Sequence, residues 1–223
     1  MLGLALAAAD ACAQVSASAS MVSDYRYRGI SLSRGDPALQ ASVAYDDASG
    51  LYGGLFVSNV QFAISPHRQL QAVAYGGYAP RLERGLGMEV GATYAAFTGP
   101  GTYDYAEAYA GIVAEGLSAR VYYAPRYFGR DSGAWYAELN VAQPLVDRVR
   151  LTAHVGLLAN LGRDTTYGAA DRRVLDGRVG IAIELAAFAV QVSWVGVGST
   201  RTGYPISQGE RRNTVVVGLS RAF

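Results

Sequence analysis

The chain has 223 residues, which is enough for one domain with a large core or for one barrel. Hydrophobic residues make up 51% of the chain, yet beyond its start no run of 18 apolar residues occurs, which excludes membrane-spanning helices. The 19 basic residues, all of them Arg, face 18 acidic residues, and neither sign forms a block. A net charge of +1 without a basic patch gives no reason to expect nucleic-acid binding.

Residues 1–14, MLGLALAAADACAQ, have the apolar core and small-residue end of a secretory signal peptide. The positively charged start of such peptides is missing, which fits a start codon further upstream or a short unstructured N-terminus. Cys12 is the only cysteine, and the residues before it lack the Leu that a lipoprotein signal places there. Export would therefore leave a mature chain without thiol or disulfide chemistry.

The next segment, residues 15–31, alternates apolar and polar side chains over roughly twice the usual length of a soluble strand. Odd positions are mostly apolar, and even positions are almost all polar, from Ser16 to Arg28. Since side chains alternate across a strand, we expect one strand with an apolar face and a charged face. A strand that crosses a bilayer needs about 9–11 residues and turns its apolar face to lipid. On this interpretation Tyr25 and Tyr27 face outward as rings at the membrane interface.

Alternation recurs along the whole chain and predicts eleven further strands. Their expected bounds are residues 37–46, 51–60, 69–78, 86–97, 103–113, 117–126, 135–142, 149–160, 175–185, 188–197 and 213–223. The segment 51–60 is apolar on both faces, so its register stays open. Twelve is an even number of strands, as bacterial outer-membrane barrels have.

The connections between these segments alternate in length. The long ones are residues 32–36, 61–68, 98–102, 127–134, 161–174 and 198–212, whereas residues 115–116 and 186–187 are examples of the short turns between them. Long loops on one side and short turns on the other fit extracellular loops and periplasmic turns. Residues 15–223 are therefore predicted to form an all-β, transmembrane, antiparallel up-and-down β-barrel of about 12 strands in outer-membrane lipid. The alternative is a soluble lipocalin-like barrel, in which the apolar faces of the strands would point inward.

The chain ends on Phe223 after an alternating apolar strand. This ending resembles the signal that the bacterial barrel-assembly machinery reads in the last strand of its substrates. The machinery is therefore an expected partner, and the bacterial outer membrane, reached through the periplasm, is the expected location.

Several motifs resemble one known family. They are SDYRYRGIS at residues 23–31, DPALQ at 36–40, GLYGG at 50–54, SNV at 58–60, YGGY at 75–78 and EAYAG at 107–111. Together they resemble the proteobacterial TorF porin family, the group long catalogued as conserved "Gcw" proteins of unknown function. The resemblance covers most of the chain and implies an outer-membrane barrel with a pore. It implies no catalytic residues and no defined substrate.

The polar faces would place charges of both signs in the lumen. The candidate lumen or constriction residues are Asp24, Arg26, Arg28, Glu89, Glu107, Arg120, Arg126, Glu138, Arg150 and Arg178, and Asp176 and Glu184 share the same faces. These charges predict either a narrow aqueous channel for small polar, zwitterionic or anionic solutes, or a plugged barrel cross-linked by salt bridges. Twelve strands lie between the eight that side chains fill and the sixteen that leave a channel.

Arg26 and Arg28 are the pair most favoured as a solute contact. Spaced by two residues on one strand face, their forked guanidiniums suit carboxylate or phosphate groups. The alternative is that Asp24, Glu89 or Glu107 neutralises them.

Other chemistry finds little support in the sequence. An enzymatic barrel needs a nucleophile and a base, but His67 falls in a predicted loop and His154 on the lumenal face, away from lipid. The two His do not share a ligand spacing, so no metal or other cofactor is expected.

Overall fold

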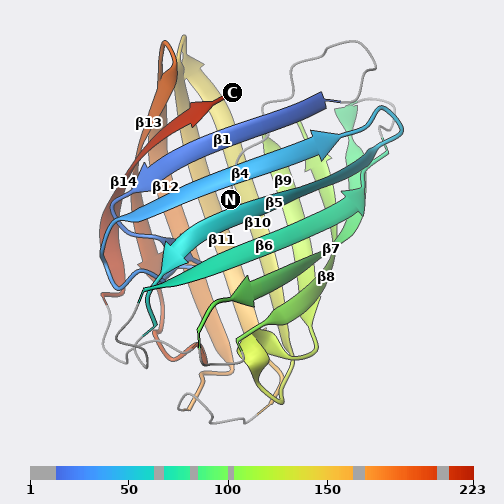
Figure 1. The fold of residues 1–223 in the computed structure, drawn as a ribbon, viewed down its shortest axis with the longest axis vertical. Coiled ribbons are helices and arrows are strands. Elements are labelled where there is room, and N and C mark those ends of the chain that lie inside the picture. Colours follow the sequence, from blue (N-terminus) through green and yellow to red (C-terminus); the bar gives the residue numbers. More distant parts are fainter. Residues whose placement is uncertain (1–13, 63–67, 81–84, 100–102, 163–168, 205–210) are drawn as a thin grey trace.

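The computed structural model describes residues 14–62, 68–80, 85–99, 103–162, 169–204 and 211–223. Twelve strands form one closed antiparallel barrel, in which each strand pairs with its neighbours in chain order and β1 closes the wall against both β4 and β14 (Figure 1). The predicted fold class is therefore confirmed. The wall strands are β1 (Gln14–Val22), β4 (Ala38–Asp46), β5 (Leu51–Val60), β6 (Gln69–Tyr78), β7 (Gly87–Phe97), β8 (Tyr105–Ala114), β9 (Leu117–Ala124), β10 (Ala134–Val146), β11 (Val149–Asn160), β12 (Arg173–Leu185), β13 (Phe188–Val197) and β14 (Asn213–Ala222).

The apolar faces of the strands point away from the barrel interior. On β4, Leu39 is 68% exposed and Val43 43% exposed, whereas charged residues elsewhere in the wall, such as Glu89 on β7 and Glu138 on β10, are buried inside. The ambiguous segment β5 follows the same rule, with Leu51 and Leu55 outward and Ser58 and Val60 buried. A soluble barrel would have the opposite arrangement, so the lipocalin-like alternative is wrong.

The predicted difference between the two ends of the barrel is also present. At one end the wall strands are joined by residues 23–37, 61–68, 98–104, 125–133, 161–172 and 198–212, which are connections of seven to fifteen residues. At the other end they are joined by residues 47–50, 79–86, 115–116, 147–148 and 186–187, which are mostly turns of two to four residues, with 79–86 the longer exception. We call these the long-loop end and the short-turn end. Within the described residues, no helix is long and apolar enough to cross a membrane. The predicted signal peptide, residues 1–14, lies outside the described residues except for Gln14, where β1 begins.

The prediction of one strand over residues 15–31 is wrong in its second half. β1 ends at Val22, and residues 23–37 leave the wall and form a small hairpin from β2 (Arg26–Tyr27) and β3 (Ile30–Ser31). Arg28 and Gly29 make its tight turn with φ values of 49° and 78°. The alternation continues through the hairpin because a short β-ribbon packed against a core has the same two-residue period as a strand packed against lipid.

Tyrosine rings lie over glycines on the inner wall. A Cβ on Gly91 would sit 2.5 Å from the hydroxyl of Tyr109, and one on Gly77 would sit 2.6 Å from that of Tyr52. Each missing side chain makes room for a ring that lies along the wall. The two hydroxyls of Tyr52 and Tyr109 are 2.5 Å apart and join β5 to β8 inside the barrel.

Candidate functional site

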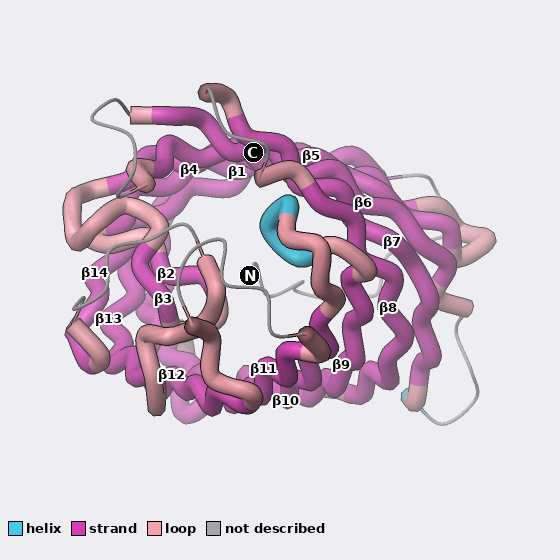
Figure 2. The backbone as a smooth tube through the Cα atoms, turned by 90° about the horizontal axis from the view of Figure 1, so that it is seen from below, coloured by secondary structure: helices cyan, strands magenta, loops and turns pink. Residues whose placement is uncertain are grey.

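The most distinctive feature of the interior is residues 23–37, which we call the lumenal hairpin. Figure 2 shows β2 and β3 inside the ring of wall strands, together with the short 3₁₀ helix η2 (Tyr127–Gly129). The hairpin is tied to the wall through its backbone, since the Leu32 carbonyl accepts a hydrogen bond from the Gln61 amide at 2.7 Å. Near its other end, the Tyr25 hydroxyl donates to Gln71 on β6 at 2.9 Å.

Arg28 stands at the tip of the lumenal hairpin and reaches the opposite wall. Its two terminal nitrogens donate to the two carboxylate oxygens of Glu107 on β8 at 2.9 and 2.8 Å, and one of them also donates to the Tyr127 hydroxyl at 2.6 Å. The side chains of Arg28 and Glu107 are only 5% and 4% exposed. The guanidinium lies 4.0 Å from the ring centroid of Tyr136, which gives a cation–π contact. Burial opposes the charge of Arg28, but Glu107 and the surrounding tyrosines outweigh it and raise its pKa.

Arg26 does not stand beside Arg28, although their spacing predicted that it would. Its Nε donates to Asp24 at 2.6 Å, and one terminal nitrogen donates to the backbone carbonyls of Gly29 and Arg211. Asp24 also accepts hydrogen bonds from Ser31 and Ser33, so this carboxylate organises the hairpin itself. The turn at Arg28 separates the two guanidiniums, and the pair is not a joint binding fork.

An aromatic cluster packs around the hairpin at the long-loop end of the barrel. Tyr27 contacts Phe128 and Tyr204, and Phe128 stacks 4.4 Å from Tyr204 between ring centroids. The prediction that Tyr25 and Tyr27 face lipid is therefore wrong, since both belong to the interior. Burial raises the pKa of the phenols of Tyr25, Tyr27, Tyr127 and Tyr204, which keeps these groups neutral.

A second ion-paired group lies on the wall itself. Arg120 on β9 donates to Glu89 on β7 at 2.5 Å and lies 3.9 Å from Glu138 on β10. The Tyr122 hydroxyl also donates to Glu138, at 3.2 Å. The Arg120 side chain is 26% exposed, whereas those of Glu89 and Glu138 are 4% and 1% exposed.

The remaining predicted residues lie in different places. Arg126 comes after the end of β9 and is exposed in the connection before η2, so it is not part of the lumenal wall. Arg150, near the short-turn end, lies 3.4 Å from Glu184, and both side chains are largely exposed. Arg178 faces inward from the middle of β12 and, within the part of the chain that the structure describes, makes neither an ion pair nor a hydrogen bond.

His154 belongs to a polar network next to Arg178. Its Nδ1 lies 2.7 Å from the Asn140 side-chain oxygen, and its Nε2 lies 3.0 Å from Asp176. The Tyr136 hydroxyl donates to Asp176 at 3.1 Å. Both ring nitrogens are thus engaged by Asn140, Asp176 and Tyr136. Among the described residues, no group of three or more His, Cys, Asp or Glu could hold a metal ion; His67 lies outside them.

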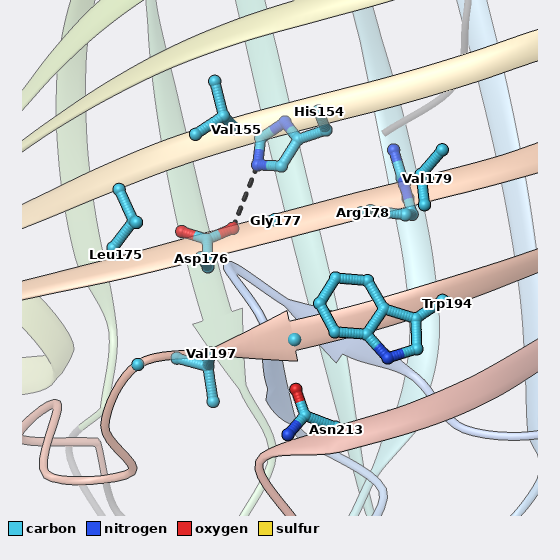
Figure 3. Close-up of a pocket in the computed structure, with 12 residues that line it drawn as sticks. His154, Val155, Leu175, Asp176, Gly177, Arg178, Val179, Trp194, Val197 and Asn213 are labelled. Carbon is cyan, nitrogen blue, oxygen red and sulfur yellow. Dashed lines mark hydrogen bonds and ion pairs between the residues drawn. The ribbon is translucent and has the colours of Figure 1, made fainter.

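A hollow of about 450 Å³ lies where β11, β12 and β13 adjoin the start of β14 (Figure 3). Its apolar lining includes Leu175 and Trp194, which face outward and are about half exposed. Gly177 and Gly196 are paired across β12 and β13, and because neither has a side chain, this part of the outer surface is open. The inward-facing His154, Asp176 and Arg178 also line the hollow, and Figure 3 shows Asp176 joined to His154, with Arg178 outside that contact.

The sequence reasoning missed the residues that close the interior around the hairpin. Tyr127 and Phe128 were expected only as loop residues, and Tyr204 and Gln71 were not singled out, yet all four are buried. A usable signal was present in the Tyr127-Phe128 dipeptide, because two large aromatic residues in a predicted exposed loop call for a buried site.

Solved structures with a similar fold include two porins and the translocator domain of an autotransporter. KdgM porin in complex with disordered oligogalacturonate aligns with a TM-score of 0.57 and 10% identity over 95% of this chain and 99% of that one. NanC porin aligns with a TM-score of 0.57 and 9% identity over 93% of this chain and 99% of that one. The translocator domain of the autotransporter NalP from Neisseria meningitidis aligns with a TM-score of 0.52 and 13% identity over 94% of this chain and 88% of that one. Among curated proteins, none matches the sequence.

The family comparison is more specific than the fold. A family profile described as "Bacterial protein of unknown function (Gcw_chp)" matches residues 6–223. The Gcw part of the resemblance is thereby confirmed, while the TorF name stays a prediction. The chain belongs to the Gcw_chp family of bacterial proteins.

Proposed function

We propose that this protein is a porin-like channel of the bacterial outer membrane, through which small polar, zwitterionic or anionic solutes diffuse. The observation that carries the proposal is the closed barrel of twelve strands with apolar side chains outside and charged side chains inside. Soluble proteins rarely expose a continuous apolar belt, whereas a transmembrane barrel requires one. The charged interior would give solutes a polar path across the hydrocarbon.

The lumenal hairpin would set the width of that path. A solute that enters at the long-loop end meets Arg28 and the aromatic cluster before it reaches the wall residues nearer the short-turn end. We therefore assign the constriction to the hairpin as a whole rather than to a free pair of arginines on the wall. The hairpin is part of the chain between β1 and β4, so the constriction forms whenever the barrel folds.

A second candidate function is a plugged, non-conducting barrel with a structural or adhesive role. The buried contact of Arg28 with Glu107 favours it, because this ion pair holds the hairpin across the lumen. On this alternative the charges cross-link the interior and no solute passes.

Single-channel conductance of the refolded protein in planar bilayers separates the two. Discrete conductance steps are expected for a channel, and steps of different size are expected for an Arg26→Ala/Arg28→Ala variant, whose hairpin has lost both ion pairs. Heat-modifiable mobility in gels would show that each sample is folded. Folded protein without steps would refute the channel and leave the plugged barrel.

The proposed location makes two further demands on the chain. Outer-membrane lipid would surround the apolar belt, and the assembly machinery would recognise the strand that ends at Phe223, whose side chain is 69% exposed. Deletion of Phe223 should lower the amount of folded barrel in the outer-membrane fraction of cells and leave refolding of the purified chain unchanged. Equal amounts in cells would argue against this recognition.

A further inference from the structure

We propose that Arg178 forms a binding site for the carboxylate group of a small solute, just beneath the lumenal hairpin. The site deepens the proposed function: its part in solute passage rests on the channel, whereas the binding itself does not.

The charged residues of the wall occupy one side of the lumen. Strands β5 and β6 contain no Asp, Glu or Arg, and neither do β1 and β13. The inward-facing charges of the wall lie on β7 to β12, apart from Asp46 at the short-turn end of β4. A solute in the middle of the lumen therefore has a neutral wall on one side and a charged wall on the other.

On the charged wall, the cations are the groups that a solute can touch. The carboxylates of Glu89, Glu138 and Asp176 have side chains 4%, 1% and 3% exposed, and each accepts hydrogen bonds from neighbouring side chains. Arg120, in contrast, is 26% exposed, and Arg178 is partly exposed. Although acids and bases are similar in number, the accessible charge in this part of the lumen is positive.

Among the described residues, Arg178 differs from the paired inward-facing arginines because no carboxylate lies within ion-pair distance of it, although Glu138 and Asp176 act on its charge from further away. Arg26, Arg28, Arg120 and Arg150 each pair with a carboxylate. In the described residues Arg178 has none, and its Nε is buried without a hydrogen-bond acceptor. Asp176, two residues away, is already engaged by His154 and Tyr136. Arg178 is partly exposed, so a carboxylate from the lumen can approach the guanidinium and supply charge-assisted acceptors that the surrounding wall does not.

Neighbouring groups suit the same ligand. Strand pairing places Asn140, His154 and Arg178 in one inward-facing row across β10, β11 and β12. The hairpin tip lies directly above this row, since a Cβ on Gly29 would be 2.8 Å from the Cβ of Asp176. Arg178 is two residues further toward the short-turn end, about 7 Å along the strand. A solute held there would stand directly below the constriction.

The test uses gluconate as the probe and glucose as its uncharged counterpart of similar size. Binding to the refolded protein in micelles is measured by saturation-transfer NMR, and ion preference by reversal potential in planar bilayers. Wild type should bind gluconate in preference to glucose, and Arg178→Gln should weaken gluconate binding on the order of tenfold or more. Arg178→Lys keeps the charge without the fork, so it should retain anion preference with weaker binding.

Arg150→Gln is the matched control, because it removes an inward arginine that already has a partner, and gluconate binding should stay at the wild-type level. If the protein conducts but Arg178→Gln binds gluconate as well as wild type does, the carboxylate site is overturned and the channel stands. Arg178-dependent binding without conductance supports the site and overturns the channel. Equal binding of gluconate and glucose by the folded wild type also overturns the site.

Discussion

Replacing Glu107 by Gln should release the lumenal hairpin from the wall. The substitution preserves shape but leaves the Arg28 guanidinium, 5% exposed, without its counter-charge. Breaking a buried ion pair by removing one partner costs about 3–5 kcal/mol, which corresponds to roughly two to four orders of magnitude in an opening equilibrium. The exposed pair of Arg150 and Glu184 should contribute less than about 1 kcal/mol, so Glu184→Gln is the control.

Amide hydrogen exchange measures this opening directly. The Gln61 amide, next to the end of β5, donates to the Leu32 carbonyl of the hairpin at 2.7 Å, and its exchange reports release of residues 23–37 from the wall. In Glu107→Gln the exchange should be faster by roughly two orders of magnitude or more, while Glu184→Gln should exchange like wild type. The double variant Arg28→Gln/Glu107→Gln should exchange more slowly than Glu107→Gln alone, since no lone charge is left buried. Wild-type exchange in Glu107→Gln would show that this ion pair does not hold the hairpin against the wall.

Three other predictions test the wall and the interior. Gly91→Ala should destabilise the barrel by about 1–3 kcal/mol, measured by chemical unfolding, because its Cβ would lie 2.5 Å from the Tyr109 hydroxyl, whereas Gly76→Ala, with its nearest atom at 3.5 Å, should be tolerated. Val43→Arg in the middle of the apolar belt should cost about 2–4 kcal/mol and Leu39→Arg near its edge about 0–1 kcal/mol, and equal costs for both would argue against a bilayer around this face. In an alkaline titration followed by tyrosinate absorbance, the buried phenols of Tyr25, Tyr27, Tyr127 and Tyr204 should ionise only well above pH 10, because burial raises their pKa. Their contribution to the stability of the barrel is complete below the unfolded-state pKa and is lost as the pH rises through the folded-state pKa values. Ionisation of all 16 tyrosines near pH 10 in the folded barrel would contradict this burial.

Most wall strands were predictable because each has lipid on one side. A uniform apolar environment imposes a strict two-residue period, and β5, β6, β11 and β13 begin and end where that period does. β10 extends past its predicted end at residue 142 to Val146, through Pro144. The pairing with β11 shifts register between Pro144 and Val146, and an irregularity of this kind lets proline remain in a strand.

The interior was harder to predict because alternation does not identify what lies on each side. Residues 23–31 alternate as well as any wall strand, but their apolar side chains meet an aromatic cluster instead of lipid. Nothing in the residue type of Arg28 predicts its positive φ of 49°, and only the neighbouring Gly29 indicates a turn at this point. Ion pairing was equally hidden, since twelve charges of balanced sign can pair in many ways. The sequence therefore predicted which residues of most wall strands face inward, but it misplaced Arg126, Tyr25 and Tyr27. It also did not predict that Arg28 would be paired and Arg178 unpaired within the described residues.

The nature of the hairpin's anchor bears on what the hairpin does. Replacing a buried ion pair by well-packed apolar residues is often neutral or stabilising, so the contact of Arg28 with Glu107 is weak evidence for added stability. In the proposed aqueous channel, both partners would regain hydration when they separate, which would lower the free-energy cost of breaking the pair. The aromatic cluster, in contrast, loses apolar burial with every ring that leaves it. A hairpin held at its tip by charges and at its base by rings and backbone hydrogen bonds should therefore open at the tip first, next to Arg178. The lumenal hairpin and the proposed carboxylate site would then act on the same solute in succession.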